Sequence, residues 1–588
     1  MMSVLLTTLN SKFIHSNLAL RYLREYTRDI EDVEIEEFTI NQNLADITAR
    51  IYEMNPRIVC FSTYIWNIDQ TLEVCERLKL VSPNTGILLG GPEVSFDMED
   101  LMIKYSFIDY VIYGEGEETF REFLVSDDPS GIKGLAYRDE GKVVVNPPRP
   151  LIGDINTIPS PYENIGDEYR NKIVYYESSR GCPFNCAFCL SSTIRGVRYM
   201  NLDRVKRDLD KLMDAGVKQV KFVDRTFNAN KEFSKEIMKH IIERDPEGTN
   251  FHLEVTAHLI DQKQLEFFQT IKEGLFQFEI GVQSTYPKTI EAIGRNTDFE
   301  KLSSVSKAIK EYRNIHQHLD LIAGLPYEGY ERFGESFNHI YALKPEKIQL
   351  GFLKLLKGSA LRKMKSQYGY KLIDKAPYEI MESKWLSYDE IISLKGIEDL
   401  VEKYYNEEYF RHSLEYLIRN NFEKPFDFFE DFMRFWKANG YYDYSHGKDK
   451  LYEIFLEYYQ HKSFKGFDVF VELLMVDYLE NSGGKTLPDF MVMEDHQDAI
   501  DYHEILKMDT ILNRFLPEYT DVPTKKILRK VRLQTFTHDI CGLIEGGYGE
   551  NQEKKRTILL FKYTDGPIER CKTFDITSYM EELTHEHN

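Results

Sequence analysis

Three of the seven cysteines fall within eight residues, and this cluster constrains the chain more than any other feature. Cys182, Cys186 and Cys189 follow a C-x3-C-x2-C spacing. Thiolates held this closely converge on one inorganic centre, and sulfur selects an iron–sulfur cluster, zinc or copper(I) over hard cations. A structural zinc site takes four protein ligands, yet the next cysteine is Cys541 and the nearest histidine is His240. We therefore expect a centre with one open metal position, with zinc or a redox dithiol as the alternatives.

The composition indicates a folded chain without a membrane segment. Hydrophobic residues make up 42% and charged residues 29% of the 588 residues, which predicts about three or four domains. The sequence has no run of about 18 apolar residues and no basic flank at its start that would indicate a signal peptide. The formal net charge of −22 argues against broad contact with a phosphate backbone. We therefore expect a cytoplasmic protein without a membrane or nucleic-acid partner.

The remaining cysteines do not predict disulfides. Seven cysteines in 588 residues, three of them clustered, are too few for a disulfide framework. Cys60 and Cys75 lie in apolar surroundings, and we expect both to be buried core thiols.

Strands and helices alternate between residue 3 and about residue 125, which favours a doubly wound parallel sheet. The expected strands cover residues 4–9, 33–40, 58–64, 85–91 and 110–114, and the expected helices residues 17–26, 44–54 and 68–80. Ligands of such sheets lie beyond the carboxyl ends of the strands. A hairpin is expected over residues 135–146, and prolines between residues 147 and 161 indicate a stiff linker.

The cysteine spacing, with Phe188 before the last cysteine, resembles the radical S-adenosylmethionine (SAM) superfamily. That resemblance implies a [4Fe-4S] cluster held by Cys182, Cys186 and Cys189, whose fourth iron binds SAM and cleaves it to a deoxyadenosyl radical. A second βα series supports the resemblance, with strands expected over residues 173–178, 217–223, 251–256, 276–281, 318–322 and 347–354. Six such units resemble the incomplete TIM-like barrel of that family, in which chemistry lies at the carboxyl ends of the strands.

The loops after the first strands, placed before such a motif, resemble the cobalamin-binding domain of one branch of the superfamily. The residues that carry the resemblance follow the third, fourth and fifth strands. They are Ser62, Thr63, Tyr64, Trp66, Gly90, Gly91, Glu93, Gly114, Glu115, Gly116 and Glu117. The sequence lacks the Asp-x-His-x-x-Gly pattern, and His15 is the only histidine before residue 240. The resemblance therefore implies cobalamin without a lower histidine ligand, and we expect His15 to be a helix-start or surface residue.

The resemblance also assigns SAM contacts at the strand ends of the barrel. Asp224 is a candidate for the ammonium group of SAM, or alternatively a helix cap. Arg295 suits the SAM carboxylate because its planar fork matches two oxygens, although a surface arginine is the alternative. The other candidates are Gln283, Ser284, Gly324, Glu254 and Glu279. For the two glutamates, the alternative is pairing with a buried arginine.

The expected domains are a cobalamin-binding domain at residues 1–150, a linker at 151–171, a barrel at 172–375 and a C-terminal domain at 376–588. Aromatic residues at helical spacing predict a largely helical C-terminal domain, with helices at 424–436 and 451–459. A strand is expected at residues 557–563. The position of this domain resembles the variable region that sets substrate identity in related enzymes.

The function implied is a cobalamin-dependent radical SAM methyltransferase that acts on an unactivated carbon. By resemblance, methylcobalamin supplies the methyl group and the deoxyadenosyl radical removes a substrate hydrogen. The alternatives are a non-methylating enzyme that closes or rearranges a ring, and a non-catalytic cluster or corrinoid carrier. The expected partners are a small-molecule or peptide substrate and an electron donor such as flavodoxin or ferredoxin.

Overall fold

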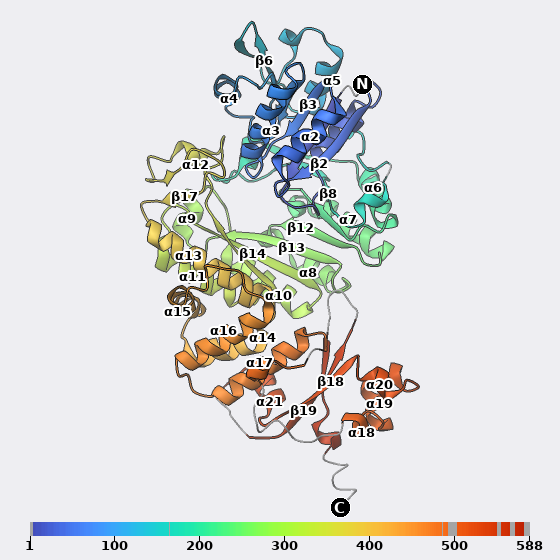
Figure 1. Ribbon diagram of the computed structural model, residues 1–588, viewed down its shortest axis with the longest axis vertical. Helices are drawn as coiled ribbons and strands as arrows, with labels where there is room; N and C mark the ends of the chain where they lie inside the picture. Colours follow the sequence, from blue (N-terminus) through green and yellow to red (C-terminus); the bar gives the residue numbers. More distant parts are fainter. Residues whose placement is uncertain are drawn as a thin grey trace, which may run out of the picture. The chain divides into compact units, whose positions relative to one another are not determined.

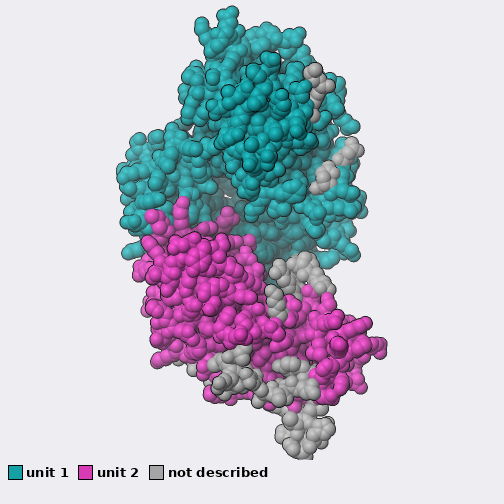
Figure 2. Space-filling view, in the orientation of Figure 1, with its two compact units in different colours: residues 1–336, 343–346, 350–391 teal, residues 337–342, 347–349, 392–588 magenta. Residues whose placement is uncertain are grey.

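The chain divides into two compact units, which Figure 2 shows in different colours. The computed structural model describes residues 4–163, 165–484, 486–491, 502–549, 554–564 and 571–580. The first unit comprises residues 1–336, 343–346 and 350–391, and the second comprises residues 337–342, 347–349 and 392–588. Within the described part of the chain, no helix is both long and apolar enough to cross a membrane.

The first unit begins with a seven-stranded sheet in the order β2-β1-β3-β4-β5-β6-β7 (Figure 1). The strands are β1 (Val4–Asn10), β2 (Val33–Thr39), β3 (Ile58–Ser62), β4 (Gly86–Gly90), β5 (Tyr110–Ile112), β6 (Leu135–Asp139) and β7 (Lys142–Val145). The helices are α1 (Leu18–Tyr26), α2 (Leu44–Met54), α3 (Ile68–Val81), α4 (Met98–Lys104) and α5 (Glu117–Val125). Strands β1 to β5 pair in parallel, which confirms the predicted doubly wound sheet.

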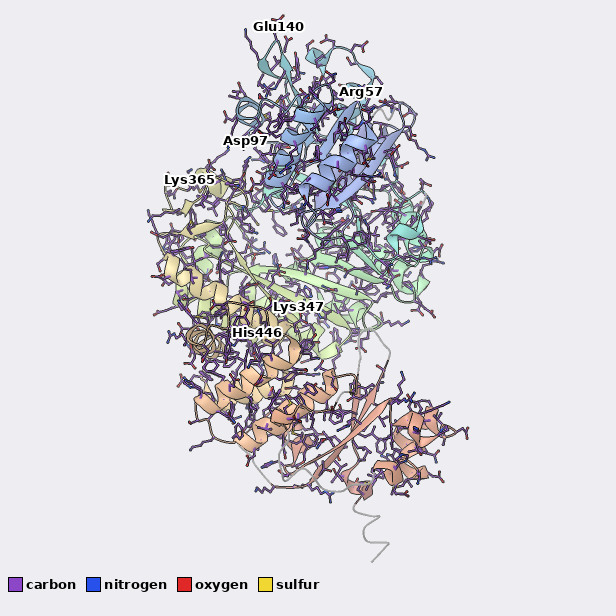
Figure 3. The ribbon with its side chains drawn as sticks, in the orientation of Figure 1. Arg57, Asp97, Glu140, Lys347, Lys365 and His446 are labelled. Carbon is purple, nitrogen blue, oxygen red and sulfur yellow. The ribbon has the colours of Figure 1, made fainter. Side chains whose placement is uncertain are left out.

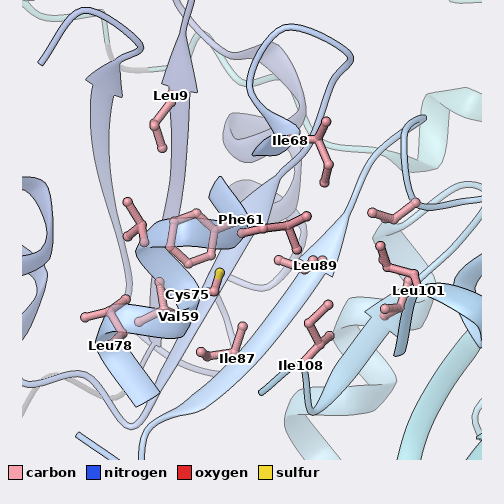
Figure 4. Close-up of a cluster of buried hydrophobic side chains, with 14 of the residues drawn as sticks. Leu9, Val59, Phe61, Ile68, Cys75, Leu78, Ile87, Leu89, Leu101 and Ile108 are labelled. Carbon is pink, nitrogen blue, oxygen red and sulfur yellow. The ribbon is translucent and has the colours of Figure 1, made fainter. Parts of the chain in front are cut away.

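Separate hydrophobic cores cover the two faces of this sheet. Successive residues of β1 point to opposite faces, so Leu5 belongs to one core and Leu6 to the other. Figure 4 shows the first core, in which Cys75 of α3 lies among apolar side chains that include Phe61. Cys60 lies in the second core. Burial raises the pKa of both thiols, and both are core residues as predicted.

The predicted hairpin is confirmed, and it extends the same sheet. Strand β6 pairs antiparallel with both β5 and β7. Glu140 and Gly141 join β6 to β7 with φ angles of 47° and 82°, and Figure 3 labels Glu140 at this turn. Positive φ at both turn residues matches the right-handed twist of the strands, which explains the Glu-Gly pair.

The second βα series forms a six-stranded sheet in the order β15-β14-β13-β12-β11-β8 (Figure 1). The strands are β8 (Ile173–Tyr176), β11 (Gln219–Phe222), β12 (Asn250–Val255), β13 (Phe276–Gln283), β14 (Ile315–Ala323) and β15 (Lys347–Phe352). A hairpin of β9 (Ser179–Cys182) and β10 (Gly196–Tyr199) follows β8. The helices are α6 (Leu202–Asp214), α7 (Lys231–Arg244), α8 (Gln262–Phe268), α9 (Pro287–Ala292), α10 (Phe299–Tyr312) and α11 (Tyr330–Tyr341). The six predicted strands are confirmed.

One face of the barrel sheet is apolar and the other is polar. On β13, the buried residues Phe276, Phe278 and Ile280 alternate with half-buried residues such as Gln277 and Glu279. Successive side chains of a strand point to opposite faces, so each class lines one face. Gln277 and Glu279 therefore lie on the polar face of this sheet.

The second unit is mainly helical. Between β15 and this unit lie the short elements α12 (Ala360–Lys363), β16 (Lys371–Leu372) and β17 (Ile380–Glu382). The helices that follow are α13 (Tyr388–Val401), α14 (Arg411–Asn421), α15 (Pro425–Ala438), α16 (Lys448–His461) and α17 (Phe467–Asn481). Within the second unit, aromatic side chains such as Trp436 and Phe455 are fully buried. The predicted helices at residues 424–436 and 451–459 are confirmed, with the aromatic residues in their core.

A three-stranded antiparallel sheet completes the second unit. It consists of β18 (Val531–Phe536), β19 (Thr557–Tyr563) and β20 (Cys571–Asp575), with α18 (Tyr502–Ile505), α19 (Asp509–Phe515), α20 (Thr524–Ile527) and α21 (Ile540–Glu545). Two buried acids of α17 anchor neighbouring segments. Asp477 accepts hydrogen bonds from the amides of His412 and Ser413 at the start of α14, and Glu472 accepts from the amide of Thr537 after β18.

Candidate functional site

The cysteine loop leaves the barrel on the β9–β10 hairpin. Gly181 on β9 has a φ of 107°. A side chain at this position would collide with the carbonyl oxygen of Gly196 on β10, so the close approach of the two strands requires glycine. The hairpin therefore determines where Cys182 leaves the sheet.

Backbone hydrogen bonds hold the rest of the loop. The amide of Ala187 donates to the carbonyl of Ile293 at 2.8 Å, and the carbonyl of Ala187 accepts from the amide of Leu361 at 2.8 Å. Ala187 lies between Cys186 and Cys189, so these bonds fix both positions. Phe188, predicted as part of the motif, is half-buried beside them.

Each of the three sulfurs lies near one polar group of the chain. The Cys182 Sγ is 3.6 Å from the Thr226 hydroxyl, the Cys186 Sγ is 3.7 Å from Arg295 Nη1, and the Cys189 Sγ accepts from the Ser191 amide at 3.4 Å. Burial raises the pKa of Cys186, and the charge and hydrogen bond of Arg295 oppose that shift. These groups are of the kind that stabilise thiolate charge.

The three thiols fit a [4Fe-4S] cluster with one open iron. They supply three sulfur ligands on one loop, with hydrogen-bond donors aimed at the sulfurs. Among the residues that the structure describes, no three His, Cys, Asp or Glu side chains are grouped to hold a single metal ion. A cluster takes each thiolate on a different iron, so it does not need such a group.

Asp224 binds the segment that precedes this loop. It is 1% exposed and accepts hydrogen bonds from the Ser178 amide at 2.9 Å, the Ser178 hydroxyl at 2.6 Å and the Ser179 hydroxyl. Burial raises the pKa of Asp224 to about 6, although these hydrogen bonds oppose the shift. The carboxyl group therefore supports the segment that enters Cys182. Its role with the SAM ammonium stays a prediction.

The two glutamates of the polar face differ in their partners. Glu279 pairs with Lys221 at 3.0 Å and with His252 at 2.8 Å. The alternative role of Glu279 was to pair with a buried arginine, and the partners found are a lysine and a histidine. Glu254 makes no hydrogen bond or ion pair with the described residues, and burial raises its pKa to about 7. Glu254 thus keeps its carboxyl group available for a ligand.

The other strand-end candidates lie at the carboxyl ends of β13 and β14. Gln283 has a φ of 70°, and its Oε1 is buried without a hydrogen-bond partner among the described residues. Ser284 instead donates to Glu328 at 2.8 Å and is 1% exposed. Gly324 has a φ of 94°, and a side chain there would collide with Ile380. Of these three candidates, Gln283 is therefore the one whose side-chain oxygen has no partner among the described residues and is available to SAM.

In the N-terminal sheet, the strand order reverses between β1 and β3, which is where ligands of doubly wound sheets bind. Ser62 ends β3 and Thr63 follows it, and both are buried. The amide and hydroxyl of Thr63 both donate to the carbonyl of Gly90, the last residue of β4. Gly91 has a φ of 108°, and a side chain there would lie 2.5 Å from the Thr63 carbonyl oxygen. The predicted Ser-Thr and Gly-Gly loops therefore meet.

Exposed aromatic groups follow these strands and fit a large planar ligand. Tyr64 and Trp66 stack with ring centroids 4.3 Å apart, and Trp66 is 47% exposed. Phe13, after β1, is 74% exposed. Beside them, the Nδ1 of His15 lies 2.8 Å from the Tyr175 hydroxyl, and burial lowers the His15 pKa. These loops fit cobalamin, because a corrin ring needs an apolar bed of this kind.

The three glutamates predicted for cobalamin form ion pairs with residues of the barrel part of the chain. Glu93 pairs with Lys357 at 3.0 Å and accepts from the Tyr378 hydroxyl. Lys357 also pairs with Asp97, labelled in Figure 3. Glu115 and Glu117 bind arginines of the β9–β10 hairpin, as described below. Gly114 and Gly116 flank them in the same turn. A cobalamin role for this turn stays a prediction.

Sequence reasoning missed the cations of these pairs. Arg180 stands in the Ser-Arg-Gly-Cys segment, so its place beside the first cysteine was a usable signal. Lys357 and Arg198 carry no such signal, because their partners lie 264 and 83 residues away in the chain.

Three family models match successive parts of the chain. The model described as "B12 binding domain" matches residues 4–124, and the model described as "Radical SAM superfamily" matches residues 176–340. A third, "Protein of unknown function (DUF4080)", matches residues 366–561.

The "Uncharacterized methyltransferase PH0819" of Pyrococcus horikoshii is 31% identical over 325 residues, which cover 53% of this chain and 70% of that protein. The chain belongs to the B12-binding radical SAM proteins. Another relative, the "Cobalamin-dependent radical SAM methyltransferase TokK" of Streptomyces tokunonensis, is 24% identical over 56% of this chain. The matched region spans 53% of the length of TokK.

Two solved structures share the fold of this B12-binding radical SAM protein. TsrM from Kitasatospora setae, with cobalamin and a [4Fe-4S] cluster bound, has a TM-score of 0.53 and 18% identity over 64% of this chain and 80% of TsrM. OxsB, with aqua-cobalamin and SAM bound, has a TM-score of 0.56 and 15% identity over 83% of this chain and 82% of OxsB. The chain is a cobalamin-dependent radical SAM enzyme whose cofactors are a [4Fe-4S] cluster, SAM and cobalamin.

Proposed function

We propose that this enzyme is a methyltransferase that adds a methyl group to an unactivated carbon. The observation that carries the proposal is the pairing of two sites within one compact unit: a three-cysteine loop that begins at the end of β9, and the apolar loops of a B12-binding sheet. Contacts such as that between His15 and Tyr175 join the two. Two relatives are named as methyltransferases. When bound, the cofactors supply the radical and the methyl group.

The residues of the chain bind and orient the cofactors and the substrate, and they shelter the reaction from solvent. Cys182, Cys186 and Cys189 hold the cluster, and Arg295 supplies a fork for the carboxylate of SAM. Gln283 and Glu254 offer polar groups to the rest of SAM on the polar face of the barrel. The loop of Tyr64 and Trp66 and the Gly-Gly loop bind cobalamin. The substrate is a small molecule or a peptide, and residues 376–588 contribute to its selection.

The test is turnover with methyl-labelled SAM. The purified enzyme, loaded with its cofactors and an electron donor such as flavodoxin or ferredoxin, is incubated anaerobically with a cell extract. The proposal expects a labelled product that is missing when Cys186→Ser replaces the parent. Deoxyadenosine without any labelled product would contradict methyl transfer.

A second function, ring closure or rearrangement without methyl transfer, uses the same cofactors. It is favoured by a relative named "Anaerobic magnesium-protoporphyrin IX monomethyl ester cyclase" from Cereibacter sphaeroides, which is 23% identical over 53% of this chain and 53% of that protein. The same incubation separates the two, because this function yields deoxyadenosine and an unlabelled product. A non-catalytic carrier would yield no deoxyadenosine even when the cluster is intact.

A further inference from the structure

The β9–β10 hairpin carries two arginines that face one another. Arg180 on β9 and Arg198 on β10 are direct partners in the antiparallel register. Like charges at such positions repel unless anions lie between them. Glu115 lies between these two, 3.3 Å from Arg180 and 2.6 Å from Arg198. The hairpin therefore depends on a carboxylate supplied from elsewhere in the chain.

That carboxylate belongs to the B12-binding sheet. Glu115 follows β5, and Glu117, the first residue of α5, pairs with Arg180 at 2.9 Å. The third carboxylate, Glu177, pairs with Arg180 at 2.9 Å from the barrel side. All three glutamate side chains are at most 13% exposed and that of Arg180 is 14% exposed, so solvent screens these pairs little.

The geometry links this group of charges to the cluster ligands. Arg180 is separated from Cys182 only by Gly181, where a side chain would collide with the carbonyl oxygen of Gly196 on the paired strand. Arginine presents its donors in a rigid planar fork, so Arg180 fixes direction as well as distance between its three partners. Because Arg180 and Cys182 lie on the same short strand, a displacement of the Arg180 backbone also displaces Cys182.

We propose that Arg180 is a positioning residue that, through Glu115 and Glu117, sets where the cluster lies relative to the B12-binding domain. The proposal rests on the cofactors of this family and not on methyl transfer. A displacement of about 1 Å between reacting centres is enough to cost two orders of magnitude in rate. The ion-pair group thereby holds the cluster and cobalamin at a working separation.

The test measures that separation directly in the full-length enzyme. The chain is reconstituted anaerobically, and pulsed EPR gives the distance between the reduced cluster and cob(II)alamin. Arg180→Gln is expected to shift the mean distance by about 1 Å or to broaden its distribution, with iron and cobalamin contents retained. Arg180→Lys, which keeps the charge without the fork, is expected to fall between Arg180→Gln and the parent.

Two further variants make the result decisive. Arg149→Gln removes ion pairs with Glu118 and Glu122 of α5. Among the residues that the structure describes, Arg149 forms no hydrogen bond or ion pair with the hairpin, so this variant should keep the parental distance. Glu117→Gln leaves Arg180 paired with Glu115 and Glu177 and is therefore the milder change. If Arg180→Gln does not fold, the distance measured in Glu117→Gln tests the proposal in its place. Parental distances in Arg180→Gln, or in Glu117→Gln in that event, would overturn the proposal. A distance effect without methyl transfer by the parent would overturn only the proposed function.

Discussion

The guanidinium of Arg295 lies 3.7 Å from the sulfur of Cys186. The same group donates to the carbonyl of Gly281 at 2.5 Å and to the hydroxyl of Thr297 at 2.9 Å. These contacts use three of the five N–H groups of the side chain, and the remaining two belong to different terminal nitrogens. Arg295 is thus held beside the cluster site with a donor pair still available for a carboxylate.

We therefore expect Arg295→Gln to weaken SAM binding about tenfold or more, because a hydrogen bond to a charged group contributes about 1.5–3 kcal/mol. Arg295→Lys should weaken it less. The measurement is a titration with SAM in which binding is detected from the change in the EPR spectrum of the reduced cluster. The iron content of each variant is the control. An unchanged titration in Arg295→Gln would contradict the assignment.

The contact between Gly91 and Thr63 predicts that cobalamin binding tolerates no side chain at residue 91. Gly91→Ala combines a positive φ with a carbonyl oxygen 2.5 Å from the new carbon, and we expect a cost of about 2 kcal/mol. Cobalamin content after reconstitution should fall with it. Gly131→Ala, where no atom lies within 4 Å and φ is not positive, is the matched control. Equal cobalamin content in both variants would contradict the prediction.

Burial of Glu328 predicts a pH dependence of stability. Its Oε1 accepts from Ser284 and Ser336, its Oε2 has no hydrogen-bond partner among the described residues, and burial raises its pKa to about 7. A carboxyl group with a raised pKa stabilises the fold below its ordinary value of 4.5, and this contribution is lost as pH rises through about 7.

Compared with Glu328→Gln, the parent should therefore lose about 3 kcal/mol of stability between pH 4.5 and pH 8, at about 1.4 kcal/mol per pH unit within that window. Glutamine keeps the oxygen that accepts from both serines, so only the titration is removed. The difference in unfolding temperature between parent and variant is followed against pH. A difference that stays constant would show that Glu328 does not titrate in this range.

Sequence patterns predicted the architecture well because apolar and polar residues alternate with the period of the strand or helix that buries one of its faces. The strand predicted at residues 557–563 coincides with β19, and β13 alternates buried and half-buried residues as a sheet with two different faces should. The pairing of β6 with β5 was not predicted, since a hairpin pattern does not reveal which edge it joins.

The site was predictable only where its residues stand close in sequence. Cys182, Cys186 and Cys189 could be recognised from their spacing. The ion pairs of Glu115 and Glu117 could not, because Arg180 lies 65 and 63 residues away and no local pattern links them. Acidic residues in a glycine-rich turn give the same signal whether they bind a ligand or another part of the chain.

Asp477 carries a prediction for the second unit. Its carboxylate accepts from the amides of His412 and Ser413 and from the Ser413 hydroxyl, and it is fully buried. Asp477→Ala leaves these donors unsatisfied, so we expect a loss of about 3 kcal/mol. Asp477→Asn keeps one acceptor oxygen and should cost less. Equal unfolding temperatures of the two variants, measured by calorimetry, would contradict this role.

The central claim is that three thiolates hold an iron–sulfur cluster with an open iron beside a bound corrinoid. The most direct measurement is elemental and absorbance analysis of the enzyme after anaerobic reconstitution, with Cys541→Ser as the control for cysteine loss. We predict about four irons and four sulfides per chain with one cobalamin, and loss of iron in Cys186→Ser but not in Cys541→Ser. Zinc at these thiols, with no iron–sulfide core after reconstitution, would contradict the account.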